Sequence, residues 1–468
     1  MQSSTDLGSD IPKAKIMGPA GYVTLVSGGA AVGGLLFGYD TAVISGTVDA
    51  LRDHFELEPL RLGWVVGSAL VGCVIGAALA GKLTDSLGRR TMLVISGALF
   101  LVSALWCVIT QSADELALAR MLGGVGVGFA SLVVPVYIAE LAPSRNRGAL
   151  VSLNQIGILV GMVLSYVVNA WIGSWGDHEW MVEFGWRIML GVEALPAALF
   201  ILMCFAIPES PRWLLQKGRE AAASGILTRL HGARQADVEL NEIRASLQER
   251  DAALGEVFGG RMRGMVAMAM ILAFFQAVTG INVVMYYAPT IFTTAHVGRG
   301  DALNHSVIIG LVMLVFTIIS MLLVDRLGRR SIMLTAAAGM GAALTLLGVS
   351  FTNQDSSGTA MLAWILVYVA FFSVGMGGIY WVVVSEIFPT RIRGVAASFS
   401  VMCLWGGNYL VSQFFPVMLT ALGGDVFYVY AFMCLLCYAF IWRFLPETKG
   451  KTLEQIEAKY FPPMGKMP

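Results

Sequence analysis

The chain has 468 residues, of which 57% are hydrophobic and only 13% are charged. Soluble domains carry about 25% charged residues, and the mean hydropathy of +0.73 also favours a membrane protein. Lys+Arg and Asp+Glu each number 31, so the net charge is zero and no nucleic-acid partner is indicated. The six cysteines lie in apolar runs without metal-site spacing, so we expect no metal site and no disulfide framework.

Twelve apolar blocks follow one another along the chain, separated by polar segments. A block of about 20 residues is long enough to cross the hydrocarbon core as a helix. Lipid offers no partner for backbone N–H and C=O groups, so these spans must be helical. The predicted spans are 21–49, 62–82, 91–111, 115–138, 151–172, 186–207, 264–294, 305–325, 331–352, 359–385, 394–420 and 427–445.

Basic residues gather before the first block and after the even-numbered blocks. This bias predicts that both termini lie in the cytoplasm of a cell that carries the protein in its inner or plasma membrane. Residues 208–263 are charged, with leucines and isoleucines at helical spacing, and Leu453–Tyr460 has a similar amphipathic pattern. The predicted organisation is a cytoplasmic N-terminal tail (1–20), a six-helix bundle (21–207), a cytoplasmic helical linker (208–263), a second six-helix bundle (264–445) and a cytoplasmic C-terminal tail (446–468).

The two bundles carry the same polar signatures in the same order. The run Asp85–Arg90 recurs 240 positions later as Asp325–Arg330. Glu140 and Arg147 recur 246 positions later as Glu386 and Arg393. Matched signatures at nearly constant offset indicate internal duplication. Duplicated membrane proteins of this kind are transporters with the substrate site between the halves, near the middle of the membrane. The fold class predicted is therefore an all-α membrane protein of two pseudo-symmetric six-helix bundles.

An ordered set of motifs makes the resemblance specific. The motifs are Gly34–Asp40 in the first span, Gly81…Asp85…Gly88-Arg89-Arg90 after the second, Pro135–Glu140…Arg147-Gly148 after the fourth, Pro208–Arg212 after the sixth, Gly280-Ile281-Asn282…Tyr286-Tyr287 in the seventh and Pro446–Gly450 after the twelfth. Together they resemble the sugar porter family of the major facilitator superfamily, over nearly the whole chain. The resemblance implies the major facilitator fold and alternating access to a monosaccharide.

Asp40 is a carboxylate deep in the first span, and Arg120 in the fourth span is its natural partner. An ionised carboxylate at such a depth costs about 2.5–3.5 kcal/mol, so it is a functional candidate by default. A group that binds a proton in one state and releases it in another couples proton flow to transport. The resemblance adds that sugar porters working without protons tend to have a neutral residue at this position. The alternative is a static buried ion pair.

Neutral amides and tryptophans interrupt the apolar spans. Sugar hydroxyls both donate and accept hydrogen bonds, as amides do, and a tryptophan offers a flat face and one N–H donor. Through the resemblance, the expected sugar contacts are Phe37, Gln155, Gln276, Asn282, Trp381, Trp405 and Asn408. The alternative is structural, since amides also hold membrane helices together and tryptophans also form interfacial belts.

Four positions depart from the family pattern. Apolar residues stand where the resemblance leads one to expect hydrogen-bonding side chains: Met162, Ala277, Met313 and Leu404. We therefore expect either a substrate with an apolar or deoxygenated face, or low affinity for common sugars.

Two further groups of residues suggest moving parts. Tyr286 and Tyr287 lie in a span that also holds Gly280 and Pro289, which weaken the helix, so this span is the expected outer gate. Charged residues at the inner helix ends are expected to form a lock between the halves when the inner side is closed, or else only to fix topology. The lock residues are Asp85, Arg89, Glu140, Arg147, Asp325, Arg329, Glu386 and Arg393.

The sequence thus predicts a proton-coupled symporter that imports a monosaccharide, either a pentose, a hexose or a related polyol. Its partners are the sugar, the proton and the lipid bilayer, and a monomer is expected to suffice. No cofactor is implied, and without a Walker A loop or a nucleophile constellation we expect neither an ATP-driven pump nor an enzyme. The alternatives are a passive sugar uniporter, a transport-dead sugar receptor and a drug or organic-ion antiporter of the same fold.

Overall fold

The computed structural model describes residues 19–143, 147–248, 262–352, 358–388, 390–447 and 449. The first half contains α1 (Pro19–Val43), α2 (Val48–His54), α3 (Pro59–Leu87), α4 (Arg89–Ile109), α5 (Ala113–Leu141), α6 (Arg147–Gly173), α7 (His178–Trp180), α8 (Trp186–Gly191) and α9 (Ala194–Ala206). The linker contains α10 (Pro211–Gln216), α11 (Glu220–His231) and α12 (Ala233–Gln248). The second half contains α14 (Met262–Val278), α15 (Ile281–Thr294), α16 (Arg299–Leu327), α17 (Arg329–Thr352), α18 (Gly358–Phe372), α19 (Gly378–Ile387), α20 (Thr390–Leu422) and α21 (Val426–Phe444).

Eleven stretches of the described residues are long and apolar enough to cross a membrane. The last of them, Ala396–Phe444, has 49 residues and includes two helices, α20 and α21, which are joined by a short turn at Gly423–Asp425. When these two are counted separately, the stretches correspond to the twelve predicted spans. The predicted all-α membrane fold is confirmed.

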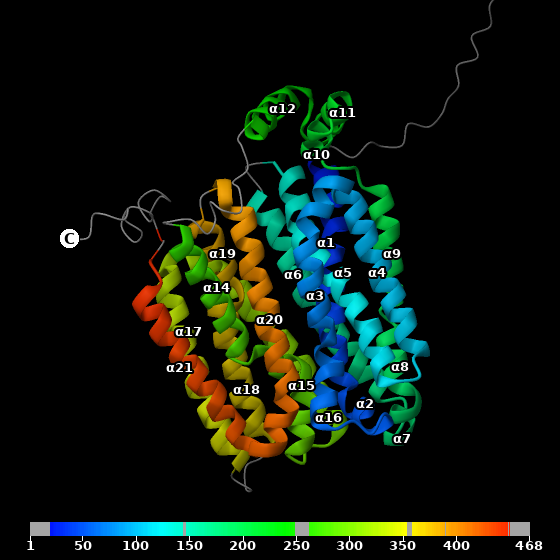
Figure 1. Ribbon diagram of the computed structural model, residues 1–468, viewed down its shortest axis with the longest axis vertical. Helices are drawn as coiled ribbons and strands as arrows, with labels where there is room; N and C mark the ends of the chain where they lie inside the picture. Colours follow the sequence, from blue (N-terminus) through cyan, green and yellow to red (C-terminus); the bar gives the residue numbers. More distant parts are fainter. Residues whose placement is uncertain are drawn as a thin grey trace, which may run out of the picture.

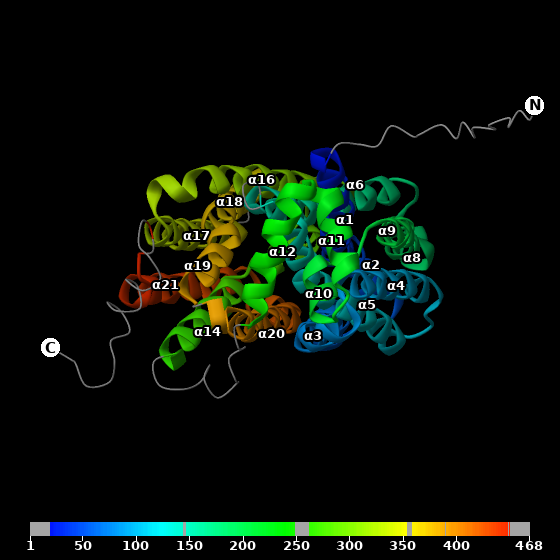
Figure 2. The ribbon, with the colours of Figure 1, turned by 90° about the horizontal axis from the view of Figure 1, so that it is seen from above.

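The helices form two bundles that pack side by side (Figures 1 and 2). Helix α3 of the first half lies along α20 of the second, and α6 lies along α16. Helices α10–α12 lie across one end of the bundles, which we call the linker end (Figure 1). The other end, where α2 and α7 lie, is called the opposite end.

The seventh predicted span is broken into two helices. Helix α14 ends at Val278, and α15 begins at Ile281 after Gly280, whose φ of +97° is a left-handed conformation that favours glycine. The hydroxyl of Tyr368 donates to the freed carbonyl of Thr279 at 3.1 Å. The sequence predicted bending from Gly280 and Pro289, and the break occurs at the glycine, whereas Pro289 stays inside α15.

The linker helices have a small apolar core of their own, formed by Leu214, Ala223, Leu227, Ala236 and Leu240. His231 attaches this core to the first bundle. Its Nε2 lies 3.0 Å from the carbonyl oxygen of Leu141 at the end of α5, and its Nδ1 lies 2.5 Å from Glu239. The amphipathic segment predicted at Leu453–Tyr460 lies outside the described residues.

Candidate substrate and coupling sites

A cavity of about 140 Å³ lies between the two halves. Helices α1 and α6 line it from the first half, and α14, α15, α16, α19 and α20 line it from the second. The seven residues predicted as sugar contacts all line this cavity, although they come from six different helices: Phe37, Gln155, Gln276, Asn282, Trp381, Trp405 and Asn408.

Four polar atoms in this cavity have no hydrogen-bond partner among the described residues. Two are acceptors, Oε1 of Gln276 and Oδ1 of Asn408, and two are donors, Nδ2 of Asn282 and Nε1 of Trp405. These four side chains are only 5–7% exposed. A buried polar group without a partner costs about 1–3 kcal/mol. The arrangement therefore suits a ligand that offers both hydrogen-bond donors and acceptors.

The residues that line the cavity are uncharged. Its lining residues include neither Asp, Glu, Lys, Arg nor His. The rings of Phe37 and Trp405 meet across the two halves, with centroids 5.6 Å apart and planes tilted by 54°. An ion would need a counter-charge on transfer into such a site, so the lining favours an uncharged ligand.

Three of the four departures from the family pattern, Met162, Met313 and Leu404, also line the cavity. The fourth does not, so the expectation that Ala277 faces the ligand is wrong. Ala277 is fully buried, and its Cβ packs where α14 meets Gly407 of α20. A Cβ added to Gly407 would lie 2.8 Å from the Cβ of Ala277, so the small side chain serves close helix packing at this point.

Asp40 and Arg120 form the predicted ion pair inside the first half. Nη1 of Arg120 lies 3.3 Å from Oδ1 of Asp40, and the guanidinium also donates to the backbone carbonyl of Asp40 at 3.3 Å. The two side chains are 2% and 3% exposed. Neither residue lines the central cavity, so the pair lies apart from the uncharged ligand site.

Glu193 joins this pair and was missed from the sequence. It lies between α8 and α9, is 3% exposed, and is electrostatically coupled to Asp40 and Arg120. Oε1 of Glu193 has no hydrogen-bond partner among the described residues. Glu193 is the single acidic residue of the predicted span 186–207, so the rule that intramembrane carboxylates are functional candidates would have found it.

The predicted gate tyrosines are both buried in α15. The Tyr287 hydroxyl donates to the carbonyl of Ser412 at 2.7 Å, and its ring lies 5.0 Å from that of Phe415. Tyr286, on the neighbouring helix position, lies within electrostatic range of Arg120 and Asp40 in the other half. A helix of the second half therefore lies near the charge cluster of the first.

The predicted lock residues form ion pairs within each half. Arg89 binds both carboxylate oxygens of Glu140 at 3.0 and 3.1 Å, and it also binds Asp85 at 3.3 Å. In the second half Arg329 binds Glu386 at 2.7 Å. Arg147 is exposed beside Glu140. The side chains of Asp325 and Arg393 lie outside the described part of the structure.

Two other glutamates cap helices at this end. The carboxylate of Glu209 accepts from the backbone N–H groups of Arg89 and Arg90 at 2.9 and 3.0 Å. Glu447 makes the corresponding bonds to Arg329 and Arg330 at 3.0 and 3.1 Å. Each satisfies free N–H groups at a helix start. The duplicated sequence motifs thus form the same structure in both halves.

At the opposite end, hydrogen bonds run from one half to the other. The hydroxyls of Thr290 and Thr293 on α15 donate to the two carboxylate oxygens of Asp49 on α2, at 3.1 and 3.2 Å. Further cross-half bonds join the Tyr166 hydroxyl to the Met285 carbonyl (2.9 Å), the Gln413 amide to the Leu60 carbonyl (2.8 Å) and the Arg299 guanidinium to the His178 ring (3.2 Å). These contacts hold the two halves together on this side of the cavity.

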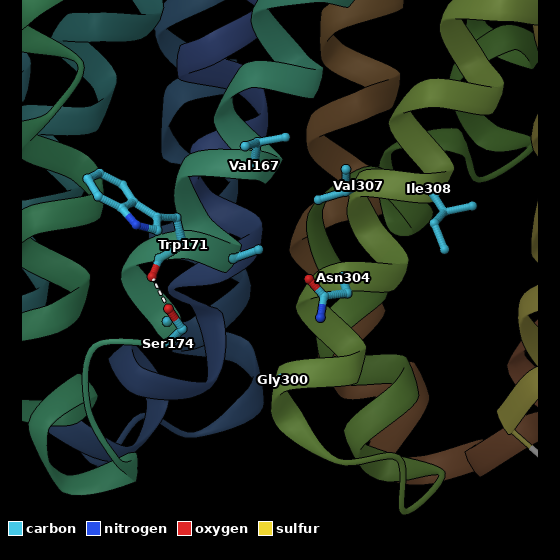
Figure 3. Close-up of a pocket in the computed structure, with 9 residues that line it drawn as sticks. Val167, Trp171, Ser174, Gly300, Asn304, Val307 and Ile308 are labelled. Atoms are coloured by element: carbon cyan, nitrogen blue, oxygen red, sulfur yellow. Dashed lines mark hydrogen bonds between the residues drawn. The ribbon is translucent and has the colours of Figure 1, made fainter.

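A wider groove of about 580 Å³ opens near the same end, between α6 and α16 (Figure 3). Trp171 and Val167 on α6, and Asn304 and Ile308 on α16, line its walls. All four of these residues are exposed on the outside of the bundle, Trp171 at 61%. Unlike the central cavity, the groove therefore faces outward and does not enclose unpartnered polar groups.

Comparison with known proteins identifies the class to which this fold and site belong. Residues 26–460 match the family model described as "Sugar (and other) transporter". The arabinose–proton symporter of Bacillus subtilis is 39% identical over 93% of this chain and 95% of its own length. The D-xylose–proton symporter of Escherichia coli, whose pattern the stretch Gly33–Val48 resembles, is 40% identical over 94% of this chain and 95% of its own length.

The chain therefore belongs to the sugar transporter family, the sugar porters of the major facilitator superfamily, as the motifs indicated. Solved structures agree with this assignment. The inward-open structure of the E. coli xylose transporter XylE matches with a TM-score of 0.84 and 39% identity, over 94% of this chain and all of that one. The structure of XylE bound to 6-bromo-6-deoxy-D-glucose matches less well, with a TM-score of 0.77 at the same coverage.

Proposed function

We propose that this protein is a proton-coupled symporter that imports a neutral monosaccharide by alternating access. One observation carries the proposal: a buried cluster of Asp40, Arg120 and Glu193 lies in the same molecule as an uncharged cavity with unpartnered amide atoms. The first part can hold and release a proton, and the second can bind hydroxyls. The sugar–proton symporters among its relatives support the same pairing of functions.

Proton binding can be coupled to transport through the charge of Asp40. With Asp40 ionised, Arg120 is neutralised by it and the two side chains stay together in a site of low dielectric. Protonation of Asp40 removes one side of the pair and frees Arg120 to change partners. The nearby Glu193 carboxyl can then accept a hydrogen bond from Arg120 while it stays protonated, so the cluster keeps the proton that Asp40 gained. Such an exchange gives two arrangements of the first half, and Tyr286 of α15 lies in electrostatic range of Asp40 and Arg120.

In this proposal the linker end faces the cytoplasm and the opposite end faces the outside. The bias of Lys and Arg toward the linker end supports this orientation. Uptake of radiolabelled monosaccharides into proteoliposomes tests the function directly, with and without an inward proton gradient. Accumulation above the external concentration, only with the gradient, is the expected result. Equal entry in both conditions would instead establish a passive uniporter.

Asp40→Asn should abolish uphill accumulation but leave sugar binding and counterflow exchange largely intact, because asparagine keeps the volume and cannot ionise. Accumulation and counterflow are measured in the same proteoliposomes. Asp114→Asn is the matched control, since Asp114 is an exposed carboxylate paired with Arg61 at the surface. If the Asp40 variant still accumulated sugar against its gradient, the coupling role would be wrong.

A further inference from the structure

The two walls of the central cavity differ in polarity. The second half supplies all four unpartnered polar atoms, from Gln276, Asn282, Trp405 and Asn408. These are two acceptors and two donors, which matches two or more hydroxyl groups of a ligand. A sugar bound here is therefore held mainly by the second half.

The first half presents an apolar wall instead. Helix α6 turns four residues toward the cavity, at the spacing of one helical face: Gln155, Ile158, Leu159 and Met162. Only the residue nearest the linker end, Gln155, is polar. The apolar part from Ile158 to Met162 extends for about 6 Å along the helix, which is comparable to the width of one sugar ring.

The remaining polar group of this wall has no free donor and can only accept a hydrogen bond. Helix α1 contributes Phe37 and Thr41, and the Thr41 hydroxyl donates to the carbonyl of Phe37 at 2.7 Å. Met285, Met313 and Leu404 add apolar surface from the second half. A thioether sulfur is only a weak acceptor, and methionine adapts its shape to apolar ligand surfaces.

From this division, and resting on the proposed function, we propose that the substrate is a deoxy sugar. By this we mean a neutral monosaccharide in which a methyl or methylene group replaces at least one hydroxyl. The hydroxyl-bearing side binds the amides of the second half, and the deoxygenated position lies against Ile158, Leu159 and Met162. A hydroxyl at that position would leave water without finding a new partner, which weakens binding.

The test compares three hexoses, D-glucose, D-galactose and L-mannose, each with its 2-deoxy and 6-deoxy analogue. Binding to the purified full-length protein is followed by the fluorescence of the cavity tryptophans, Trp381 and Trp405. In the series that binds best, at least one deoxy analogue should bind about ten-fold more tightly than its parent, the effect of one unpaired buried hydroxyl. Parents that bind at least as tightly as both analogues in every series would overturn the inference but leave sugar transport standing.

Two variants test whether the apolar wall causes the preference for the deoxy analogue. Met162→Gln adds a hydrogen-bonding group of similar size and should bring the deoxy analogue and its parent to within about two-fold of each other. Met162→Leu stays apolar and should keep the ten-fold preference. Equal loss in both variants would show that shape, and not polarity, selects the ligand. If no sugar bound to a protein that is monodisperse on size exclusion, the proposed function itself would be overturned.

Discussion

The two ends of the molecule use polar side chains in different ways. At the linker end, the described ion pairs of Arg89 and Arg329 join residues of the same half. At the opposite end, Asp49 accepts hydrogen bonds from α15 of the other half. Contacts within one half move with it when the halves rock, whereas contacts between the halves must break.

This difference assigns a separate role to each end. The contacts of Asp49 with Thr290 and Thr293, which we call the outer latch, stabilise only the state in which the opposite end is closed. The pairs at the linker end tie helix ends together in every state and so keep each half rigid. Alternating access needs both properties, because a rocking motion requires rigid bodies and reversible contacts between them.

Breaking an ion pair at the linker end should have the largest effect on stability. Arg89→Met leaves Glu140 without its arginine, at a site where the two side chains are 7% and 10% exposed. Removing one partner of a buried pair costs about 3–5 kcal/mol, so the midpoint of thermal unfolding should fall clearly. Tryptophan fluorescence of the detergent-solubilised protein measures it.

Arg329→Met in the second half is the matched control for this loss. Its pair with Glu386 is more exposed, at 12% and 29%, so its midpoint should fall less. An equal or larger fall for Arg329→Met would contradict the view that burial sets the strength of these ties.

The outer latch should have a smaller effect that changes conformation and not stability. Thr293→Val removes one donor to Asp49. Because a hydrogen bond to a charged group contributes about 1.5–3 kcal/mol, the population opened at the opposite end should rise about ten-fold. Labelling of a cysteine at Met285 by a membrane-impermeant maleimide from outside reports this opening.

The neighbouring Thr294 provides the control for the latch. Its hydroxyl donates to the backbone carbonyl of Thr290 within α15, so Thr294→Val makes the same substitution but removes a hydrogen bond that does not cross between the halves. Labelling should stay at the wild-type level in that variant. If both valine variants labelled equally fast, the cross-half bond would not be what holds this end closed.

Much of the fold and of the cavity could be predicted from the sequence, because lipid restricts the solutions to apolar helices and duplicated motifs fix their order. The sequence also predicted the Asp40–Arg120 contact, because two buried opposite charges need each other. The outer latch was not predicted. Asp49, Thr290 and Thr293 are ordinary polar residues near helix ends, and only the packing of the halves brings them together.

Other misses have a different physical origin. Glu193 lies in a span that is strongly apolar as a whole, so its single carboxylate was overlooked although its depth alone marked it. Ala277 was expected at the cavity because the family usually has a second glutamine at its position. A rotation of about 100° between successive helix residues instead turns it toward Gly407. An apolar sequence pattern determines neither the direction in which a single side chain points nor whether each end of the cavity is open.

The smallest expected effect concerns the predicted lock at the linker end. In the described structure Glu140 is held by Arg89 in its own half and by Ser210 at the start of the linker. The cross-half lock is proposed for the state in which the linker end is closed. Ion pairs at a wet interface contribute about 0–1 kcal/mol each. Neutralising Glu140 and Arg393 together should therefore shift the equilibrium only a few-fold toward the state open at the linker end. A cysteine at Ser152, on the linker side of Gln155, should then label faster from that side.

Arg89→Met is the control, because it breaks the Arg89–Glu140 pair but leaves Arg393 in place. It should lower the unfolding midpoint without the same gain in labelling, which separates loss of the lock from loosening of the first half. Unchanged labelling in the double variant would leave these charges with the role of setting topology alone.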